Sequence, residues 1–344
     1  MKFNYEGGKE NTGNTQKIDV DYKALNDHLI EVVDCEEPQV VNGVVAGIVD
    51  LGVQEQPDAQ YSLQGDEVGK TIAQLNEMFA EQLADGSITK FEEAYNNDIK
   101  AKEIQKFVPQ KPRHSVDMFI DFPDIMVDKG QFFGVDKSEE KPYRIALGGQ
   151  FWQKSKGENG LMLLQKMMAL KVTNIGVPNG DLVWSLNPKS ILYRMAVDGG
   201  LIKTGETFLP EQITDLLGKT YQFQIHVWNK PNKKTGKTYF TENIKYIGKL
   251  PRGGLPFENY PTFCTMFNPP ITQDEDGNEV QKNDPEALKQ IRAVQLNQMQ
   301  QSPAFSDSII AEELKDRIKG GKSKPPVVPE QKDTDTDLDD SLPF

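Results

Sequence analysis

Apolar and polar residues alternate most regularly in the segment Tyr-Gln-Phe-Gln-Ile-His-Val-Trp, which covers residues 221–228. Because successive side chains of a strand point to opposite faces, one face of this segment is apolar: Tyr221, Phe223, Ile225 and Val227. The other face carries Gln222, Gln224, His226 and Trp228. A turn at 229–236 leads into a second strand-like stretch, 237–247, so the pattern predicts a β-hairpin with a flexible tip.

A first long strand is predicted from Pro38 to about Val53, where valine and isoleucine dominate. Gly43 and Gly47 interrupt this strand, and glycine inside a strand is typical of a bulge or a sharp bend. A long first strand that bends is what a small closed barrel needs. An ordinary strand with a turn at Gly43 fits the same residues.

Further elements follow Pro112. A strand from Val116 to Val127 is predicted to break at Pro123, and residues 143–147 form the next strand. Residues 160–170, Gly-Leu-Met-Leu-Leu-Gln-Lys-Met-Met-Ala-Leu, predict a compact amphipathic helix whose methionines fill the core. A short helix is expected at 210–217.

Residues 66–106 differ from the β pattern around them. Apolar residues recur there at helical spacing: Ile72, Leu75, Met78, Phe79 and Leu83, then Phe91, Tyr95, Ile99 and Ile104. The break between the two sets falls at Asp85-Gly86. We therefore expect an inserted helical hairpin, and further helices at about 284–300 and 306–319.

Together these patterns predict a mainly β protein with helical additions. Residues 1–25 are expected to be a flexible N-terminal arm, and residues 26–255 a core domain that carries the insertion at about 66–106. Residues 256–319 form a C-terminal helical extension, and residues 320–344 a disordered linker and acidic tail.

Composition narrows the class of protein. The net charge is −13, from 39 Lys and Arg against 52 Asp and Glu, which excludes a surface coated all over with DNA-binding residues. Cys35 and Cys264 cannot form a disulfide framework, so a reducing compartment is expected. The three histidines and two cysteines are too scattered for most zinc sites. We expect no membrane span, which needs ~20 apolar residues, and no signal peptide.

Charge is nevertheless concentrated locally. Residues 219–252 contain eight basic residues and one acidic residue, a net charge of +7. Aromatic residues lie between the lysines: Tyr221, Phe223, Trp228, Tyr239, Phe240 and Tyr246. Lysines attract phosphates, and aromatic rings stack on unpaired bases, so this combination predicts a groove for single-stranded nucleic acid.

A second, smaller basic and aromatic patch is predicted around residues 141–156, and two more basic residues precede the strand at 116. The candidate nucleic-acid contacts are Lys111, Arg113, Tyr143, Arg144, Phe151, Trp152, Lys154, Trp228, Lys230, Lys233, Lys234, Lys237, Tyr239 and Lys245. The alternative is a solvated lysine-rich hairpin whose aromatic residues belong to the core. By the period-two argument half of these aromatic residues must be core.

The chain ends in an acidic run, Asp333, Asp335, Asp337, Asp339 and Asp340, followed by Ser-Leu-Pro-Phe. Such a segment buries too little apolar surface to fold alone. It could act as a solubilising tail, but an apolar tip beside the terminal carboxylate suits a shallow apolar pocket ringed by basic residues. The candidate partner-binding residues are Asp337, Asp339, Asp340, Leu342, Pro343 and Phe344.

The ending Asp339-Asp340-Ser-Leu-Pro-Phe344 resembles the acidic tip of bacterial and phage single-stranded DNA-binding proteins. Other segments are similar to a tailed-phage group of these proteins: Gly47-Ile-Val-Asp-Leu-Gly-Val-Gln54, Val227-Trp228, Gly236-Lys-Thr-Tyr239, Asn243-Ile-Lys-Tyr-Ile247, Asn268-Pro-Pro270 and Leu314-Lys-Asp-Arg-Ile318. The resemblance covers about 38–60, 112–255 and the C-terminal segment. It does not extend to the insertion or the N-terminal arm.

This resemblance implies an OB-fold core, a five-stranded Greek-key barrel, that binds single-stranded DNA without sequence preference. It implies roles in phage DNA replication, recombination and repair in the cytoplasm of an infected bacterium. The acidic tip would recruit a polymerase, helicase, primase or nuclease. It implies no cofactor and no membrane partner.

An enzyme is the less favoured class. Asp117, Asp121 and Asp124 are candidate Mg²⁺ ligands of a nuclease, but Asp117 and Asp121 lie ~13 Å apart along a strand, too far to share one metal pair. Gly-Lys-Thr at 69–71 and 218–220 lacks the preceding glycine of a phosphate-binding loop. We expect no catalytic residues and no metal ligands. The alternatives to a DNA-binding protein are an acidic interaction or decoy protein and, less favoured, a metal-dependent nuclease.

Overall fold

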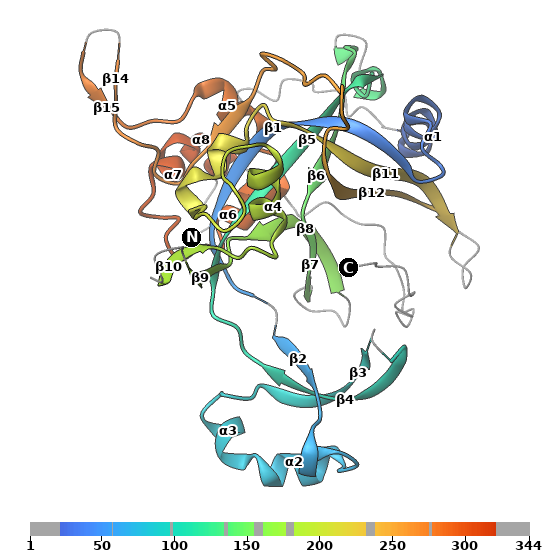
Figure 1. Ribbon diagram of the computed structural model, residues 1–344, viewed down its shortest axis with the longest axis vertical. Helices are drawn as coiled ribbons and strands as arrows, with labels where there is room; N and C mark the ends of the chain where they lie inside the picture. Colours follow the sequence, from blue (N-terminus) through green and yellow to red (C-terminus); the bar gives the residue numbers. More distant parts are fainter. Residues whose placement is uncertain are drawn as a thin grey trace, which may run out of the picture. The chain divides into compact units, whose positions relative to one another are not determined.

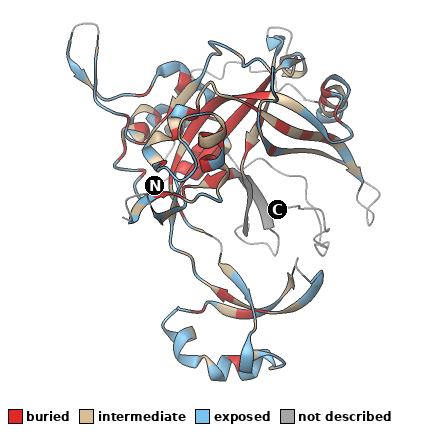
Figure 2. Cartoon of the chain, viewed as in Figure 1, coloured by how far each residue is buried: buried red, intermediate tan, exposed pale blue. Residues whose placement is uncertain are grey.

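The computed structural model describes residues 21–56, 58–96, 99–133, 137–154, 161–176, 182–231, 238–274 and 277–320. The fold is mainly β, with 38% strand and 27% helix, as the sequence predicts. No sheet among the described strands closes into a barrel. Figure 1 shows the elements in chain order, and Figure 2 shows that burial is greatest along the strands of the large sheet.

The strands are β1 (Gln39–Gln54), β2 (Ala59–Ser62), β3 (Lys90–Asn96), β4 (Ala101–Val108), β5 (Arg113–Val127), β6 (Lys141–Leu147), β7 (Gly149–Lys154), β8 (Leu161–Ala169), β9 (Val172–Gly176), β10 (Leu182–Leu186), β11 (Thr220–Pro231), β12 (Thr238–Lys249), β13 (Phe263–Thr265), β14 (Thr272–Gln273) and β15 (Glu279–Val280). The helices are α1 (Tyr22–Val33), α2 (Ile72–Met78), α3 (Ala80–Ala84), α4 (Ile191–Asp198), α5 (Pro285–Gln290), α6 (Ala293–Met299), α7 (Ile309–Glu313) and α8 (Lys315–Gly320). Short 3₁₀ helices are η1 (Gly65–Glu67), η2 (Gly130–Phe133) and η4 (Pro210–Leu216).

Eight strands form one hydrogen-bonded sheet in the order β12-β11-β1-β5-β8-β7, with β13 beside β1 and β6 beside β5. The chain divides into two compact units. Unit 1 comprises residues 1–45, 119–145 and 218–260, and unit 2 comprises the remaining residues. Strands β1, β5 and β6 contribute residues to both units.

The hairpin of unit 1 has the predicted alternation. Along β11, Tyr221, Phe223, Ile225 and Val227 are fully buried, while the residues between them are half-buried. β11 pairs antiparallel with β12 from Tyr221–Lys249 to Pro231–Thr238, and with β1 from Thr220–Val44 to Ile225–Gln39. The apolar face of β11 is therefore the core of unit 1, and its polar face carries the candidate site.

β1 is one continuous strand, so the turn and the bulge considered at Gly43 are both wrong. Its pairing with β11 shows no register shift between Gln39 and Val44. The glycine is needed for close packing instead: a Cβ atom at Gly43 would lie 2.7 Å from Ile120 Cγ2 and 2.8 Å from Phe122 Cε1. At Gly47 a Cβ atom would lie 2.1 Å from the ring of Phe263, whose strand β13 runs parallel to β1.

Two other predictions from apolar patterning are wrong. Residues 161–169 form strand β8, not a helix, and Met167 and Met168 are buried as neighbours, which fits a strand covered on both faces. A short apolar run does not distinguish a helix from such a strand. β5 also continues through Pro123 without a break. Its residues from Ser115 to Phe122 are all buried, and their packing stabilises the strand up to the proline.

The insertion is only partly helical. α2 and α3 occupy its first half, but residues 90–96 and 101–108 form the β-hairpin β3–β4, which pairs with β2 in a three-stranded sheet. Leu75 of α2 packs with Ile88 and Phe91 in a small separate core. The spacing of Phe91, Tyr95 and Ile99 imitates a helix, although the Asn-Asn-Asp sequence between them is typical of a hairpin turn.

The predicted C-terminal end of the N-terminal arm, residue 25, is wrong. Residues 1–20 lie outside the described part, but helix α1 begins at Tyr22, inside the predicted arm. The Asp21 side chain caps this helix by accepting hydrogen bonds from the amides of Lys23 and Ala24, and Leu25, Leu29 and Val33 form its buried stripe. The predicted C-terminal helices are present as the short pairs α5–α6 and α7–α8. The predicted helix at 210–217 is a 3₁₀ helix.

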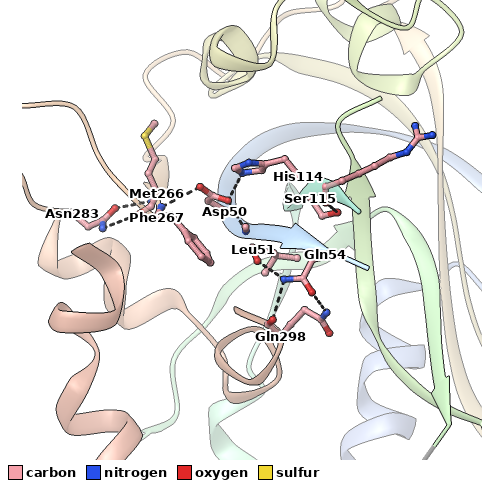
Figure 3. A network of polar contacts seen from close by, with 11 residues as sticks. Asp50, Leu51, Gln54, His114, Ser115, Met266, Phe267, Asn283 and Gln298 are labelled. Carbon is pink, nitrogen blue, oxygen red and sulfur yellow. Dashed lines mark hydrogen bonds and ion pairs between the residues drawn. The ribbon is translucent and has the colours of Figure 1, made fainter. Parts of the chain in front are cut away.

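Asp50 on β1 is the centre of a polar network in unit 2 (Figure 3). Its Oδ1 lies 2.6 Å from Nε2 of His114, and its Oδ2 accepts a hydrogen bond of 3.1 Å from the amide of Phe267. Asn283 then holds Met266 through two bonds of 2.8 and 3.0 Å. Through these hydrogen bonds, the chain after β13 is connected to β1 and to the start of β5.

In the described part of the chain, no helix has the length and apolar character needed to cross a membrane.

Gly43→Ala is expected to lower the free energy of unfolding by about 1–3 kcal/mol, because the added methyl group must displace fully buried side chains. Gly176→Ala is the control, since nothing lies within 4 Å of a Cβ atom there. Urea denaturation of both variants measures the difference. Equal stability of the two would contradict close packing at Gly43.

Stability is also expected to depend on pH through His114. The hydrogen bond to Asp50 raises the pKa of His114 above its ordinary value of 6.5, although burial opposes this. The imidazole of His114 therefore binds its proton more tightly in the folded state than in the unfolded state. The contribution of protonated His114 to the free energy of unfolding is fully present below pH 6.5, the ordinary pKa. It is lost as the pH rises through the pKa of His114 in the folded protein. Asp50→Asn should flatten this decline in denaturation profiles, while His28→Gln should leave it. A decline that persists in Asp50→Asn would show another group is responsible.

Candidate nucleic-acid interface

The polar face of the β11–β12 hairpin is the candidate interface of unit 1. Residues directly opposite each other in an antiparallel pair share a face. On this face Gln224 lies opposite Lys245, His226 opposite Asn243, and Trp228 opposite Thr241. Lys245 is exposed, and the others are half-buried. The face therefore offers amides, a hydroxyl, an ammonium group and one indole ring.

Trp228 does not stand alone on this face. Its ring stacks on the imidazole of His226, with centroids 3.6 Å apart and planes 10° apart. The two residues are adjacent on one face of β11, because they are two positions apart. The stack covers one side of the indole and fixes its orientation.

The surroundings of Trp228 are acidic. A groove beside it is lined by Asp27, Ile30 and Glu31 of α1, by Glu36 and Glu37, and by Trp228 and Asn229. Four carboxylates here would repel a phosphate group. The sequence pattern missed them because they precede Trp228 by about two hundred positions. No local signal in the sequence places them beside the hairpin.

The basic residues of the segment 219–252 differ in exposure. Lys230 is half-buried opposite Tyr239, and Lys219 is half-buried, whereas Lys249 and Arg252 are exposed. Lys233, Lys234 and Lys237, together with the side chain of Tyr239, lie outside the described residues.

Two candidates, Tyr143 and Arg144, have partners within the protein. Tyr143 is fully buried and donates a 2.7 Å hydrogen bond to Oε2 of Glu242, and burial raises the pKa of its hydroxyl group. Arg144 donates from Nε and Nη2 to the two oxygens of Asp121, at 2.6 and 2.9 Å. Asp121 is buried and also accepts a bond from the hydroxyl group of Tyr260. Tyr143 cannot stack on a base because it is buried, so it is not retained as a DNA contact. Arg144 pairs with a buried carboxylate, but its side chain is 34% exposed and it stays a candidate.

Of the remaining candidate residues, the structure describes the side chains of two. Lys111 is exposed in the loop before β5, and Arg113 is its first, half-buried residue. Phe151, Trp152 and Lys154 lie in β7, which pairs with β8, but their side chains are outside the described part. The tail candidates Asp337, Asp339, Asp340, Leu342, Pro343 and Phe344 also lie outside it.

The carboxylates of β5 are engaged separately. Asp117 accepts hydrogen bonds from Gln295, at 2.7 Å, and Arg292, at 3.3 Å. Asp121 is occupied by Arg144, and Asp124 is exposed. Within the described ranges no three His, Cys, Asp or Glu side chains come together as a metal site. These pairings disfavour the use of Asp117 and Asp121 as ligands of one metal.

No protein-family model, no curated protein and no solved structure matches this chain.

Proposed function

We propose that this chain is a sequence-independent single-stranded DNA-binding protein that coats DNA during phage replication, recombination and repair. The observation that carries the proposal is the β11–β12 hairpin. Its segment has a net charge of +7, one face is an aromatic core, and the other presents polar groups and Trp228. Lysines would bind the phosphates and rings the bases, with no contact that depends on base identity.

The strand order supports an OB-type core as part of this proposal. Five strands follow one another as β6-β5-β1-β11-β12. In chain order these are the third, second, first, fourth and fifth strands, the order of an OB barrel opened between its third and fifth strands. The hydrogen bond from Tyr143 on β6 to Glu242 on β12 joins the two outer strands. In OB folds the loop between strands four and five binds oligonucleotides, and here that loop carries Lys233 and Lys234.

The acidic groove restricts how DNA would bind. Phosphates are favoured near Lys245 and the hairpin tip and disfavoured beside Glu36 and Glu37. The same carboxylates support the second candidate function, an acidic interaction protein that binds a basic partner without binding DNA. Binding measurements distinguish the two candidates.

Fluorescence anisotropy with labelled oligo-dT and with duplex, each with and without Mg²⁺, tests the proposal. We expect tight binding to oligo-dT, weak binding to duplex and no cleavage. If four to six lysines neutralise phosphates, log K should fall with log salt with a slope of about −3 to −4. A flat salt response or an absence of oligo-dT binding would favour the interaction protein, and Mg²⁺-dependent cleavage would favour the nuclease.

The triple variant Lys233→Ala, Lys234→Ala, Lys237→Ala should flatten this slope by about 2 without changing the preference among oligonucleotide sequences. The charge-matched control replaces Lys282, Lys289 and Lys315, three exposed lysines of the C-terminal extension. An equal effect of both triple variants would show a general charge effect and not a DNA contact at the hairpin.

We further propose that the acidic tip recruits replication and repair enzymes and competes with DNA for the hairpin lysines. The sequence predicts residues 320–332 as a spacer, and a flexible chain of that length would span about 20 Å. Deleting residues 333–344 should raise DNA affinity, most at low salt, where charges act over the longest range. The deletion should also abolish co-precipitation of a polymerase, helicase, primase or nuclease partner.

Two variants separate these roles. Phe344→Ala should lose the enzyme partner but keep the competition, because the charges remain. Replacing the five tail aspartates by Asn should relieve the competition. Unchanged DNA affinity after deletion, at all salt concentrations, would exclude the competition, and normal recruitment by Phe344→Ala would exclude docking through the ring.

A further inference from the structure

A second aromatic surface lies in unit 2, on the two-stranded sheet formed by β9 and β10. Trp184 is 62% exposed and Leu182, on the same face, is 72% exposed. In the register of the hairpin, Trp184 lies opposite Asn174 and Leu182 opposite Gly176. A tryptophan is usually among the most buried residues, so an indole left open on a strand requires an explanation.

The base of this hairpin is held firmly. Leu186 is fully buried and its amide donates a 2.7 Å hydrogen bond to the carbonyl of Phe208. The hydroxyl group of Ser185 accepts a 3.0 Å bond from the amide of Phe208. The amide of Asn187 donates to the carbonyl of Lys171 at 2.8 Å. Trp184 is therefore presented on a strand whose next residues are fixed, which favours binding by lowering the cost of ordering.

Two exposed lysines lie at the base of the β9–β10 hairpin, whereas carboxylates line the groove beside Trp228. Lys171 immediately precedes β9, Lys189 follows β10, and both are exposed. Neither β9 nor β10 contains an acidic residue, and the acid closest in sequence is Asp181, directly before β10. Lys171 is three residues from the partner of Trp184, about 10 Å along the strand. Lys189 lies five residues after Trp184, so both lysines are at the base of the hairpin. An exposed ring beside this basic end suits a base followed by its phosphates.

We propose that Trp184 stacks on an unpaired DNA base while Lys171 and Lys189 bind phosphates. This inference rests on the proposed function and adds a second contact surface to it. It selects single-stranded DNA over an apolar peptide, because the two exposed lysines at the base of the hairpin favour a ligand that carries phosphates beside a stacking base. An apolar peptide would instead use Leu182 as much as Trp184.

The chain has three tryptophans, so one double variant isolates the signal. In Trp152→Phe, Trp228→Phe, all indole emission comes from Trp184. Oligo-dT should quench this emission in step with the anisotropy of the labelled oligonucleotide, since a stacked base quenches indole fluorescence. Binding without a change in emission would overturn the inference.

Affinity gives a second, independent measurement. Trp184→Ala should weaken oligo-dT binding about 5- to 150-fold, the range for one stacked base. Trp184→Phe should lose less, and Leu182→Ala is the matched control that removes exposed apolar surface without a ring. Melting temperatures should be unchanged, because both side chains are mostly exposed. Equal losses for Trp184→Ala and Leu182→Ala would overturn stacking in favour of an apolar docking surface.

These outcomes are separable from failure of the proposed function. If the unmodified protein does not bind oligo-dT, both proposals fall. If it binds with the expected salt slope while Trp184→Ala binds equally well, only the Trp184 contact is excluded. If Trp184→Ala binds more weakly, replacing Lys171 and Lys189 by Ala should also reduce the salt slope by about 1.4, and an unchanged slope would exclude the two phosphate contacts.

Discussion

The pairing register between β1 and β11 is the constraint on which the candidate interface depends. Gly43 lies opposite Tyr221, and the space where its Cβ atom would stand is filled by Ile120, Phe122 and Phe223. A shift of β1 by one residue would bring Asn42 or Val44, each with a Cβ atom, into that space. Because side chains alternate along a strand, a shift of β11 by one residue would turn Phe223 outward and bury Trp228. One glycine thus helps determine which face of the hairpin is available to a ligand.

The sequence predicted this hairpin well because one of its faces is buried and the other is not. Along β11 the fully buried and half-buried residues follow the alternation of the printed sequence. The same reasoning fails for β8, where Met167 and Met168 are both buried and no alternation remains to be detected. It also fails at Phe91 and Tyr95, where strand residues happen to follow helical spacing. Patterning predicts elements with one exposed face and is ambiguous for the rest.

The candidate site was predictable only as far as its residues are neighbours in the sequence. The basic segment and the orientation of Trp228 follow from local order. Glu36 and Glu37 lie beside Trp228 because of the tertiary fold, and no spacing rule indicates this. Tyr143 was assigned as a DNA contact, although its period-two spacing with Ile145 and Leu147, buried on the same face of β6, indicated the core. A count of lysines and aromatic residues therefore overstates the number of candidate DNA contacts, because it includes side chains of the core.

The charges that surround an exposed aromatic ring in the folded protein determine how favourably it could stack on a base that carries a phosphate. Trp228 stacks on His226 at the edge of a groove with four carboxylates, whereas Trp184 is more open and has lysines at the base of its hairpin. Stacking energy is similar for any accessible indole, but each base brings a phosphate, whose energy depends on the sign of the charges around it. If the chain of net charge −13 binds DNA as proposed, stacking is favoured at the ring with fewer carboxylates beside it. By this criterion Trp184 is the better placed of the two rings, although the sequence pattern alone selected Trp228.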